Sequence, residues 1–437
     1  MLTLLAYGMV LVFMTLIMTD RLSALLALIL VPIAFALIGG FAGTMGPMMI
    51  AGIRNLAPTG VLLLFAILYF GIMIDAGLFD PVARTVLGLV KGDPVRIMVG
   101  TTVLASIVSL DGDSSTSYII TTTAMLPLFK RLGMKPHYAA CVIMLAAGNM
   151  NLTPWGGPTA RAASALHVDA NALFVPLIPT MLACLAFAIF VAWVLGKRER
   201  ARIGIANLPG LDNIASPVGG EVDTVEPLPA YRRPRLLMFN FGLTMVLMAC
   251  LLFGVLPLPI LFMVGFAIAT AVNYPNLAEQ KQRIAAHAPN VLAVVSLIFA
   301  AGIFTGILSG TGMVDAMAKS VTAIIPDSAG PYLPAITALL SIPFTFLVSN
   351  DAFYFGILPI LAEAGAAYGH SAEAMGRASL VGQQVHLLSP LVASTYLLVG
   401  LCEVDFGAHQ RFTLPWALGM AAVMLATGVL IGVIPLF

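Results

Sequence analysis

Charged residues are scarce in this 437-residue chain. Asp, Glu, Lys and Arg together make up 9% of it, whereas 60% of the residues are hydrophobic and the mean hydropathy is +1.01. Soluble globular proteins carry about 25% charged residues, so the composition excludes a soluble fold. We expect a polytopic membrane protein in the inner or plasma membrane of the cell.

Other absences exclude further classes of protein. The four cysteines lie in apolar segments, without paired spacing or neighbouring histidines, so neither a zinc site nor a disulfide is expected. The 21 basic and 20 acidic residues form no basic stripe with interleaved aromatics, which excludes a nucleic-acid partner. No metal-hydrolase spacing or nucleophile–base pair occurs among the intramembrane polar residues, so we do not expect an enzyme or a tightly bound cofactor.

Two polar blocks interrupt the apolar sequence. They are S-L-D-G-D-S-S-T from Ser109 to Thr116 and V-S-N-D from Val348 to Asp351. Together they contain three acids, Asp111, Asp113 and Asp351. An ionised carboxylate near the bilayer centre costs roughly 2.5–3.5 kcal/mol on insertion scales, and acids retained at that depth usually have a function. The two blocks therefore indicate a transport site.

The apolar segments predict an all-α fold of two inverted repeats. We expect about ten transmembrane helices, counting each broken helix once, and two re-entrant hairpins. The first repeat, 1–196, has spans at 2–19, 22–41, 60–78 and 173–196, a hairpin at 95–129 and a broken helix at 138–166. The second repeat, 236–437, has spans at 236–256, 258–273, 291–308 and 414–437, a hairpin at 333–364 and a broken helix at 378–402. The first apolar run is expected to be a span rather than a signal peptide.

A polar linker at 197–235 joins the repeats and sets their orientation. It carries seven basic residues at its ends, which places it in the cytoplasm by the positive-inside rule. Both termini are then external, and the two hairpins enter the membrane from opposite faces. Their tips can meet near the midplane beside the broken helices, which are interrupted at 148–159 and 382–390.

Several motifs resemble those of the citrate-metal:proton symporter (CitMHS) family of the ion transporter superfamily, over nearly the whole chain. They are L-D-G-D from Leu110, L-P-L-F-K-R-L-G-M from Leu126, N-L-T-P-W-G-G-P-T-A-R-A-A from Asn151, S-N-D-A-F-Y-F-G-I-L-P from Ser349, H-L-L-S-P-L-V-A from His386 and D-F-G-A-H-Q-R from Asp405. The resemblance implies uptake of citrate as a complex with a divalent cation, together with protons, by a homodimer with a moving, elevator-type transport domain.

A sodium-coupled di- or tricarboxylate transporter is the alternative. Those relatives of the family carry a Ser-Asn-Thr motif at each hairpin tip, whereas this chain has acids at the first tip and Asp351 after Ser349 and Asn350 at the second. The departure argues against simple sodium coupling. A channel or an arsenite-type efflux protein is a second alternative, and the acidic tips argue against oxyanion efflux.

A divalent cation reconciles the acids with an anionic substrate. Citrate alone is a trianion that three carboxylates would repel, but Mg²⁺ or Ca²⁺ binds the hard oxygens of both. The predicted metal ligands are Asp111, Asp113 and Asp351, with amide oxygens of Asn149, Asn151 and Asn350 beside them. Any acid that does not bind the metal is a candidate for the coupled proton. His386 is another candidate, or else a neutral hydrogen-bonded histidine.

Donors to the substrate carboxylates are expected from hydroxyl groups, helix N-termini and one arginine. Arg161 has two open interpretations, a bidentate carboxylate clamp or a structural partner of an acid. The full predicted substrate-binding set is Ser114, Ser115, Thr116, Asn149, Asn151, Thr153, Gly157, Thr159, Arg161, Ser349, Asn350, His386 and Ser389. The remaining histidines, His137, His167, His287, His370 and His409, are expected at the surface.

Overall fold

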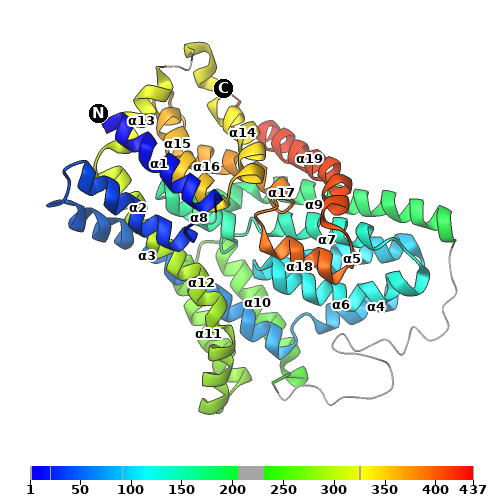
Figure 1. The fold of residues 1–437 in the computed structure, drawn as a ribbon. Coiled ribbons are helices and arrows are strands. Elements are labelled where there is room, and N and C mark those ends of the chain that lie inside the picture. The colour runs from blue at the N-terminus through cyan, green and yellow to red at the C-terminus, as the bar shows by residue number, and fades with distance from the viewer. Residues whose placement is uncertain (1, 20, 91, 205–230, 324–325, 437) are drawn as a thin grey trace.

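The computed structural model describes residues 2–19, 21–90, 92–204, 231–323 and 326–436, and the described residues are helical, without a β-strand (Figure 1). In a lipid environment a helix satisfies its backbone hydrogen bonds within one segment. The predicted all-α membrane fold is confirmed. Seven of the described helices are long and apolar enough to cross a membrane, and α1, α2 and α11 are shorter apolar helices.

The helices follow the predicted order in both halves. The first half contains α1 (Leu2–Met18), α2 (Ala24–Ile38), α3 (Met45–Ala76), α4 (Asp80–Val90), α5 (Pro94–Val108), the 3-10 turn η1 (Ser109–Asp111), α6 (Ser114–Leu132), α7 (Pro136–Met150), α8 (Gly157–Leu166) and α9 (Ala170–Ile203). The second half contains α10 (Leu237–Leu252), α11 (Leu258–Asn273), α12 (Leu277–Gly310), α13 (Met313–Thr322), α14 (Leu333–Leu347), the π-helical turn η5 (Ala352–Ile357), α15 (Leu358–Ala366), α16 (Ala372–Ser379), the 3-10 turn η6 (Leu380–Gly382), α17 (Gln383–His386), α18 (Ala393–Leu401) and α19 (Phe406–Leu430).

Several boundaries differ from the sequence-based expectation. The third span of each half is longer than predicted: α3 has 32 residues and α12 has 34, because each helix begins well before its apolar stretch. The added part of α3 is mostly apolar with one charge, Arg54, whereas that of α12 carries Glu279, Lys281 and Arg283. The short amphipathic helices α4 and α13 were not predicted, since neither is apolar enough to be a span. The predicted linker begins inside α9, and its part from 205 to 230 lies outside the described residues.

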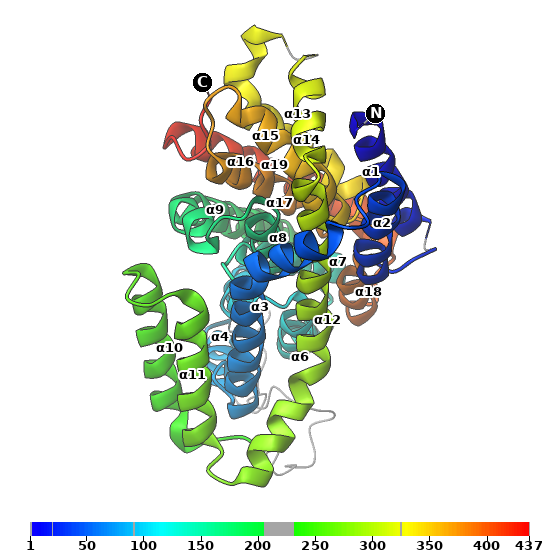
Figure 2. The ribbon, with the colours of Figure 1, turned by 90° about the vertical axis from the view of Figure 1, so that its left-hand side faces the viewer.

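Six helices form a group that we call the frame: α1, α2, α3, α10, α11 and α12. Its centre is the crossing of α3 and α12, where glycines let the two backbones touch. A Cβ added at Gly52 would lie 1.9 Å from the carbonyl oxygen of Gly302 and 2.8 Å from the Cα of Gly306. Figure 2 shows α10 and α11 standing beside α3, which packs against α11.

The other long elements form a second group, the tip unit, made of α5 to α9 and α14 to α19. Its two hairpins are α5–η1–α6 and α14–η5–α15, and its two broken helices are α7–α8 and α16–η6–α17–α18. Helix α9 holds this group together by packing against α5, α7, α8, α16 and α19. The short helices α4 and α13 connect the frame to the two hairpins.

Ion pairs gather where α3 ends and α12 begins. Asp75 contacts Arg283 at 3.6 Å and His287 at 2.9 Å, and Arg233 contacts Glu279 at 2.9 Å. The α11–α12 connection lies at the end of the molecule opposite both termini (Figures 1 and 2).

One expectation for the histidines is wrong. His409 was expected at the surface, but it is fully buried in α19, where its Nδ1 and the Thr413 hydroxyl are 3.2 Å apart.

Candidate functional site

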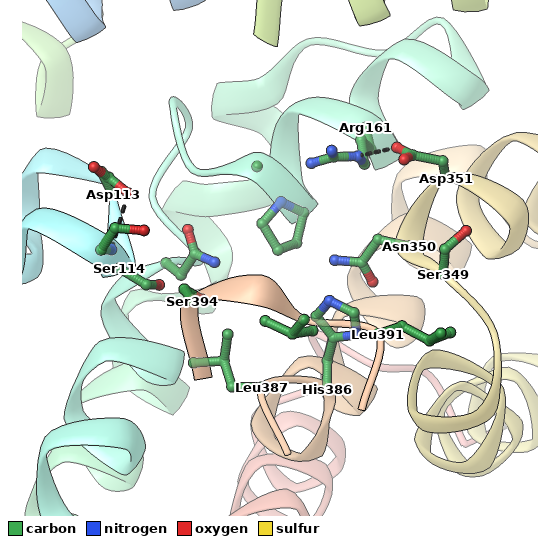
Figure 3. Close-up of a pocket in the computed structure, with 16 residues that line it drawn as sticks. Asp113, Ser114, Arg161, Ser349, Asn350, Asp351, His386, Leu387, Leu391 and Ser394 are labelled. Carbon is green, nitrogen blue, oxygen red and sulfur yellow. Dashed lines mark hydrogen bonds and ion pairs between the residues drawn. The ribbon is translucent and has the colours of Figure 1, made fainter. Parts of the chain in front are cut away.

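The hairpin tips and the broken helices enclose a cavity of about 380 Å³ (Figure 3). Its walls come from both halves of the chain. The lining residues are Gly112, Asp113, Ser114, Ser115, Asn151, Gly157, Pro158, Arg161, Ser349, Asn350, Asp351, His386, Leu387, Leu391, Val392 and Ser394.

The first tip turns at Gly112, which has a φ of +79°, a conformation that favours glycine. Asp113 then caps α6. One carboxylate oxygen accepts the Ser115 N–H at 3.0 Å, and the other accepts the Thr116 N–H at 3.4 Å and the Thr116 hydroxyl at 2.7 Å. These donors fix the carboxylate at the edge of the cavity.

Asp111 has a different environment from Asp113. It is 6% exposed and does not line the cavity. Its Oδ1 accepts the backbone N–H of Asp113 at 2.9 Å and the Ser117 hydroxyl at 3.4 Å. The structure therefore gives Asp111 a place inside the turn of the tip, away from the cavity to which the sequence assigned it.

The first broken helix is unwound between Met150 and Gly157. The backbone folds back so closely at Gly156 that a Cβ there would lie 1.9 Å from the carbonyl oxygen of Asn151, so only glycine fits. Trp155 fixes the loop to the first tip, because its Nε1–H donates to the Leu110 carbonyl at 2.9 Å. The N-terminus of α8 then opens on the cavity at Gly157, an arrangement suited to anions.

The second tip presents Ser349, Asn350 and Asp351. The Asn350 amide pairs with the Gln383 amide of α17 through bonds of 3.2 and 3.0 Å. Asp351 accepts a hydrogen bond from Nε of Arg161 at 2.6 Å, in an ion pair whose side chains are 15% and 21% exposed (Figure 3). This pair joins the second tip to α8 and thus links the two halves of the chain across the cavity.

The second broken helix supplies His386 and an apolar wall. His386 is 8% exposed, and its Nδ1 lies 2.6 Å from the carbonyl oxygen of Thr345 in α14. Leu387, Leu391 and Val392 complete this side of the cavity. No sequence signal singled out the last three, because apolar residues in an apolar chain do not stand out.

Six predicted site residues do not line the cavity. Asp111 and Thr116 form their hydrogen bonds within the first tip. Three others also use their polar groups within the fold: Asn149 Nδ2 donates to the Met181 carbonyl at 3.0 Å, Thr159 donates to the Leu152 carbonyl at 2.9 Å, and the Ser389 hydroxyl accepts the Leu391 N–H at 3.2 Å. The full set is Asp111, Thr116, Asn149, Thr153, Thr159 and Ser389. The lining residues that were not predicted are Gly112, Pro158, Leu387, Leu391, Val392 and Ser394.

The donor set of the cavity limits what it can bind by itself. Among the described residues, no three His, Cys, Asp or Glu side chains lie close enough to hold a metal ion. The cavity contains two acids, Asp113 and Asp351, and one guanidinium, Arg161. A divalent cation prefers six or more oxygen ligands, so a cation in this cavity needs ligands that arrive with it.

Known proteins give a consistent assignment. A family model described as citrate transporter (CitMHS) matches residues 9–382. The chain is 58% identical over 437 residues to a citrate transporter of Bacillus subtilis (strain 168), covering 99% of this chain and 100% of the relative. It is 53% identical over 435 residues to a Mg(2+)/citrate complex secondary transporter of the same organism, covering 99% of each.

Two solved structures share the fold at low sequence identity. The YdaH transporter of Alcanivorax borkumensis, described as having an unusual topology, matches with a TM-score of 0.58 and 16% identity over 99% of this chain and 98% of that chain. The Neisseria gonorrhoeae antimetabolite efflux pump MtrF matches with a TM-score of 0.57 and 13% identity over 88% and 84%. With the family model and the close relatives, the helical structure shows that this chain belongs to the CitMHS family of citrate transporters, and that it is a multi-pass membrane transporter and not an enzyme.

Proposed function

We propose that this protein is a secondary transporter that imports citrate as a complex with a divalent metal ion, of the Mg²⁺ or Ca²⁺ type, in symport with protons. The observation that carries the proposal is the composition of the cavity, which holds two carboxylates and one guanidinium but no three-ligand metal site. A metal–citrate complex complements it, because citrate supplies oxygen ligands and the two acids supply the rest. The names of the two Bacillus subtilis relatives support the same substrate.

The Arg161–Asp351 pair provides a physical route to coupling. In the structure the two charges neutralise each other at 2.6 Å. When a citrate carboxylate takes the guanidinium, Asp351 loses its partner, and its carboxylate then needs a metal ion or a proton. Binding of the substrate at Arg161 thus favours uptake of a second cation at Asp351. Asp113, fixed at the cap of α6, would supply an oxygen ligand to the metal.

Alternating access by an elevator movement is supported by the way the frame meets the tip unit. Among the described residues, the ion pairs and side-chain hydrogen bonds lie within the frame, within the tip unit or on the connecting helices, for example Lys130–Glu403 and Asp93–Arg200 within the tip unit. Across the boundary the ring of Trp155 contacts Phe70 of α3 and Phe262 of α11, with centroid distances of 5.5 and 4.9 Å. An apolar boundary permits sliding without the loss of hydrogen bonds.

The same proposal includes an orientation and an assembly. We place the linker in the cytoplasm and both termini outside, since basic residues such as Arg233 and Arg283 gather at the end of the molecule opposite the termini. A homodimer is proposed from the resemblance to the family. With this orientation, residues 1–196 and 236–437 form two repeats that lie in opposite directions relative to the membrane.

Uptake by proteoliposomes tests the function. Purified protein is reconstituted, and radiolabelled citrate uptake is measured with a proton gradient or a sodium gradient, each with Mg²⁺, with Ca²⁺ or with excess chelator. We expect uptake that requires a divalent ion and an inward proton gradient. Uptake that needs sodium and persists without a divalent ion contradicts the proposal and supports the sodium-coupled alternative.

A further inference from the structure

The hydrogen bond of His386 fixes which ring nitrogen carries a proton. Nδ1 lies 2.6 Å from the Thr345 carbonyl oxygen, which only accepts hydrogen bonds, so Nδ1 must be the donor. In the neutral ring Nε2 then carries a lone pair. The side chain lines the cavity and rises towards its open centre (Figure 3). The hydrogen bond to the backbone of α14 thus makes Nε2 of the imidazole a hydrogen-bond acceptor that faces the cavity.

The surroundings of the ring favour this neutral form. The cationic Arg161 lines the same cavity and engages Asp351, the acid of the second tip, at 2.6 Å. Once a citrate carboxylate takes the guanidinium, the proposed metal ion or proton engages Asp351 instead. Asp113 is engaged by the first turn of α6. A protonated ring would therefore face one cation without a free anion beside it, at a position that is 8% exposed.

Most neutral acceptors of the cavity already accept a hydrogen bond, are buried or can also act as donors. The Asn350 amide oxygen accepts from Gln383, and the Ser349 hydroxyl accepts the Ala352 N–H. The Asn151 amide oxygen has no hydrogen-bond partner among the described residues, but it is buried beneath the surface of the wall. The hydroxyls of Ser114, Ser115 and Ser394 also line the cavity, but each can turn its hydrogen towards a citrate carboxylate and act as a donor.

Nε2 of His386, in this tautomer, can only accept. The carboxylates of citrate need donors or a cation, whereas its hydroxyl group can donate to an acceptor. In the proposed function the carboxylates of Asp113 and Asp351 are taken by the metal ion or a proton, which leaves the imidazole for the hydroxyl.

We propose that Nε2 of His386 accepts a hydrogen bond from the citrate hydroxyl and makes the transporter select a hydroxylated tricarboxylate over the same tricarboxylate without the hydroxyl. The inference rests on the proposed function and adds a specificity-determining residue to it. A site that hydrogen-bonds a substrate hydroxyl rejects an analogue that lacks it, by about 10⁴-fold to 10⁵-fold in closed sites. In this open cavity water replaces part of the bond, so we expect about 10-fold to 100-fold.

Propane-1,2,3-tricarboxylate is the test substrate, because it has the three carboxylates of citrate and no hydroxyl. Uptake of both compounds is measured in proteoliposomes at matched concentrations of their Mg²⁺ complexes. Two variants dissect the ring: in His386→Asn the amide nitrogen replaces Nδ1 and nothing replaces Nε2, whereas in His386→Gln an amide oxygen reaches the Nε2 position. We expect the wild type and His386→Gln to prefer citrate and His386→Asn to lose at least 10-fold of that preference.

The outcomes separate this inference from the function on which it rests. If the wild type does not transport Mg²⁺–citrate, the proposed function fails. If the wild type transports it and His386→Asn keeps the wild-type preference, the hydroxyl contact is refuted. A changed order of preferred metals in His386→Asn, at an unchanged citrate preference, also refutes the contact and makes Nε2 a metal ligand.

Nitrogen NMR of the wild type tests the same point without a variant. Protein labelled with ¹⁵N-histidine in detergent is titrated with the Mg²⁺ complexes of citrate and of propane-1,2,3-tricarboxylate. We expect a non-protonated ring nitrogen whose signal shifts with citrate and does not shift with the analogue. His386→Asn assigns the signal if it folds. The inference is overturned if the spectrum of His386→Asn, which retains five histidines, still contains the citrate-sensitive signal. It is also overturned if both compounds shift that signal equally in the wild type.

Discussion

At the scale of single residues, the three intramembrane acids have three different environments. Asp111 accepts hydrogen bonds inside the first tip, Asp113 caps α6 at the edge of the cavity, and Asp351 pairs with Arg161 across it. Backbone donors hold the carboxylates of Asp111 and Asp113 in place, whereas the carboxylate of Asp351 is held by another side chain and can change partners. We therefore assign the change of partner during transport to Asp351.

Asp111→Asn should retain most of the uptake activity. The asparagine Oδ1 still accepts the Asp113 N–H and the Ser117 hydroxyl, so the turn of the tip survives. Asp111→Ala removes both bonds and should reduce uptake at least about 10-fold by loosening the tip. Initial rates of citrate uptake in proteoliposomes check both variants. If Asp111→Asn is as inactive as Asp111→Ala, the negative charge itself is required, which would support a role for Asp111 in binding the metal or the proton.

The Arg161–Asp351 pair should show strong coupling in a double-mutant cycle. Arg161→Gln and Asp351→Asn should each abolish uptake. Each should also lower the free energy of unfolding by about 1–3 kcal/mol, because each leaves a half-buried charge without its partner. The double variant should be more stable than the sum of the single losses predicts. Thermal unfolding in detergent measures the cycle, and additive losses would show that the two side chains are not paired in solution.

At the scale of elements, glycine decides how closely α3 and α12 approach. Gly52, Gly302 and Gly306 remove the side chains at the crossing, which lets one backbone lie against the other. The same reason explains why the first broken helix turns at Gly156. In both places a glycine is required by a close backbone contact, with another helix at Gly52 and with the preceding loop residue Asn151 at Gly156.

Gly52→Ala should destabilise the protein, and Gly46→Ala is its matched control. Both glycines lie in α3, but the added Cβ meets backbone at 1.9 Å at position 52 and nothing within 4 Å at position 46. We expect a loss of about 1–3 kcal/mol for Gly52→Ala from overpacking. For Gly46→Ala we expect no loss or a gain of up to about 1 kcal/mol. Thermal unfolding of both variants in detergent measures this difference. Equal unfolding temperatures would mean that the helices can separate at the crossing without cost.

At the scale of the whole molecule, the frame and the tip unit meet through apolar and aromatic contacts, while each is held together internally by hydrogen bonds and ion pairs. A movement between them therefore disturbs few polar interactions. Helix α1 of the frame touches the second hairpin where Val10 meets Gly356. A Cβ built on Gly356 lies 3.3 Å from Cγ1 of Val10, which is within reach of a disulfide.

A disulfide between Val10→Cys and Gly356→Cys should stop transport reversibly. The bond ties the second hairpin to the frame, so the tip unit cannot slide. The pair is introduced after Cys141, Cys184, Cys250 and Cys402 are replaced, and uptake is measured after oxidation and again after reduction. Each single-cysteine variant under the same oxidant is the control. Full uptake by oxidised, cross-linked protein would exclude an elevator movement at this boundary.

The sequence by itself determined the environment of this protein and the segments that form its site. A hydrophobic fraction of 60% requires the membrane, and acids such as Asp113 and Asp351 stand out there because the cost of placing a charge in lipid removes those without a role. The broken helices were readable for a similar reason, since proline and glycine interrupt a helix wherever they occur. These are local properties, and each depends on a short stretch of the chain.

Only the tertiary structure decided which polar groups share the cavity and which are used by the fold. Asn149 and Asn151 are two residues apart, yet the first donates to α9 and the second lines the cavity. The pairing of Arg161 with Asp351 joins residues 190 positions apart, and the proton on Nδ1 of His386 is set by a carbonyl of another helix. The direction of a hydrogen bond depends on where the partner lies, and the partner is placed by packing of the whole chain.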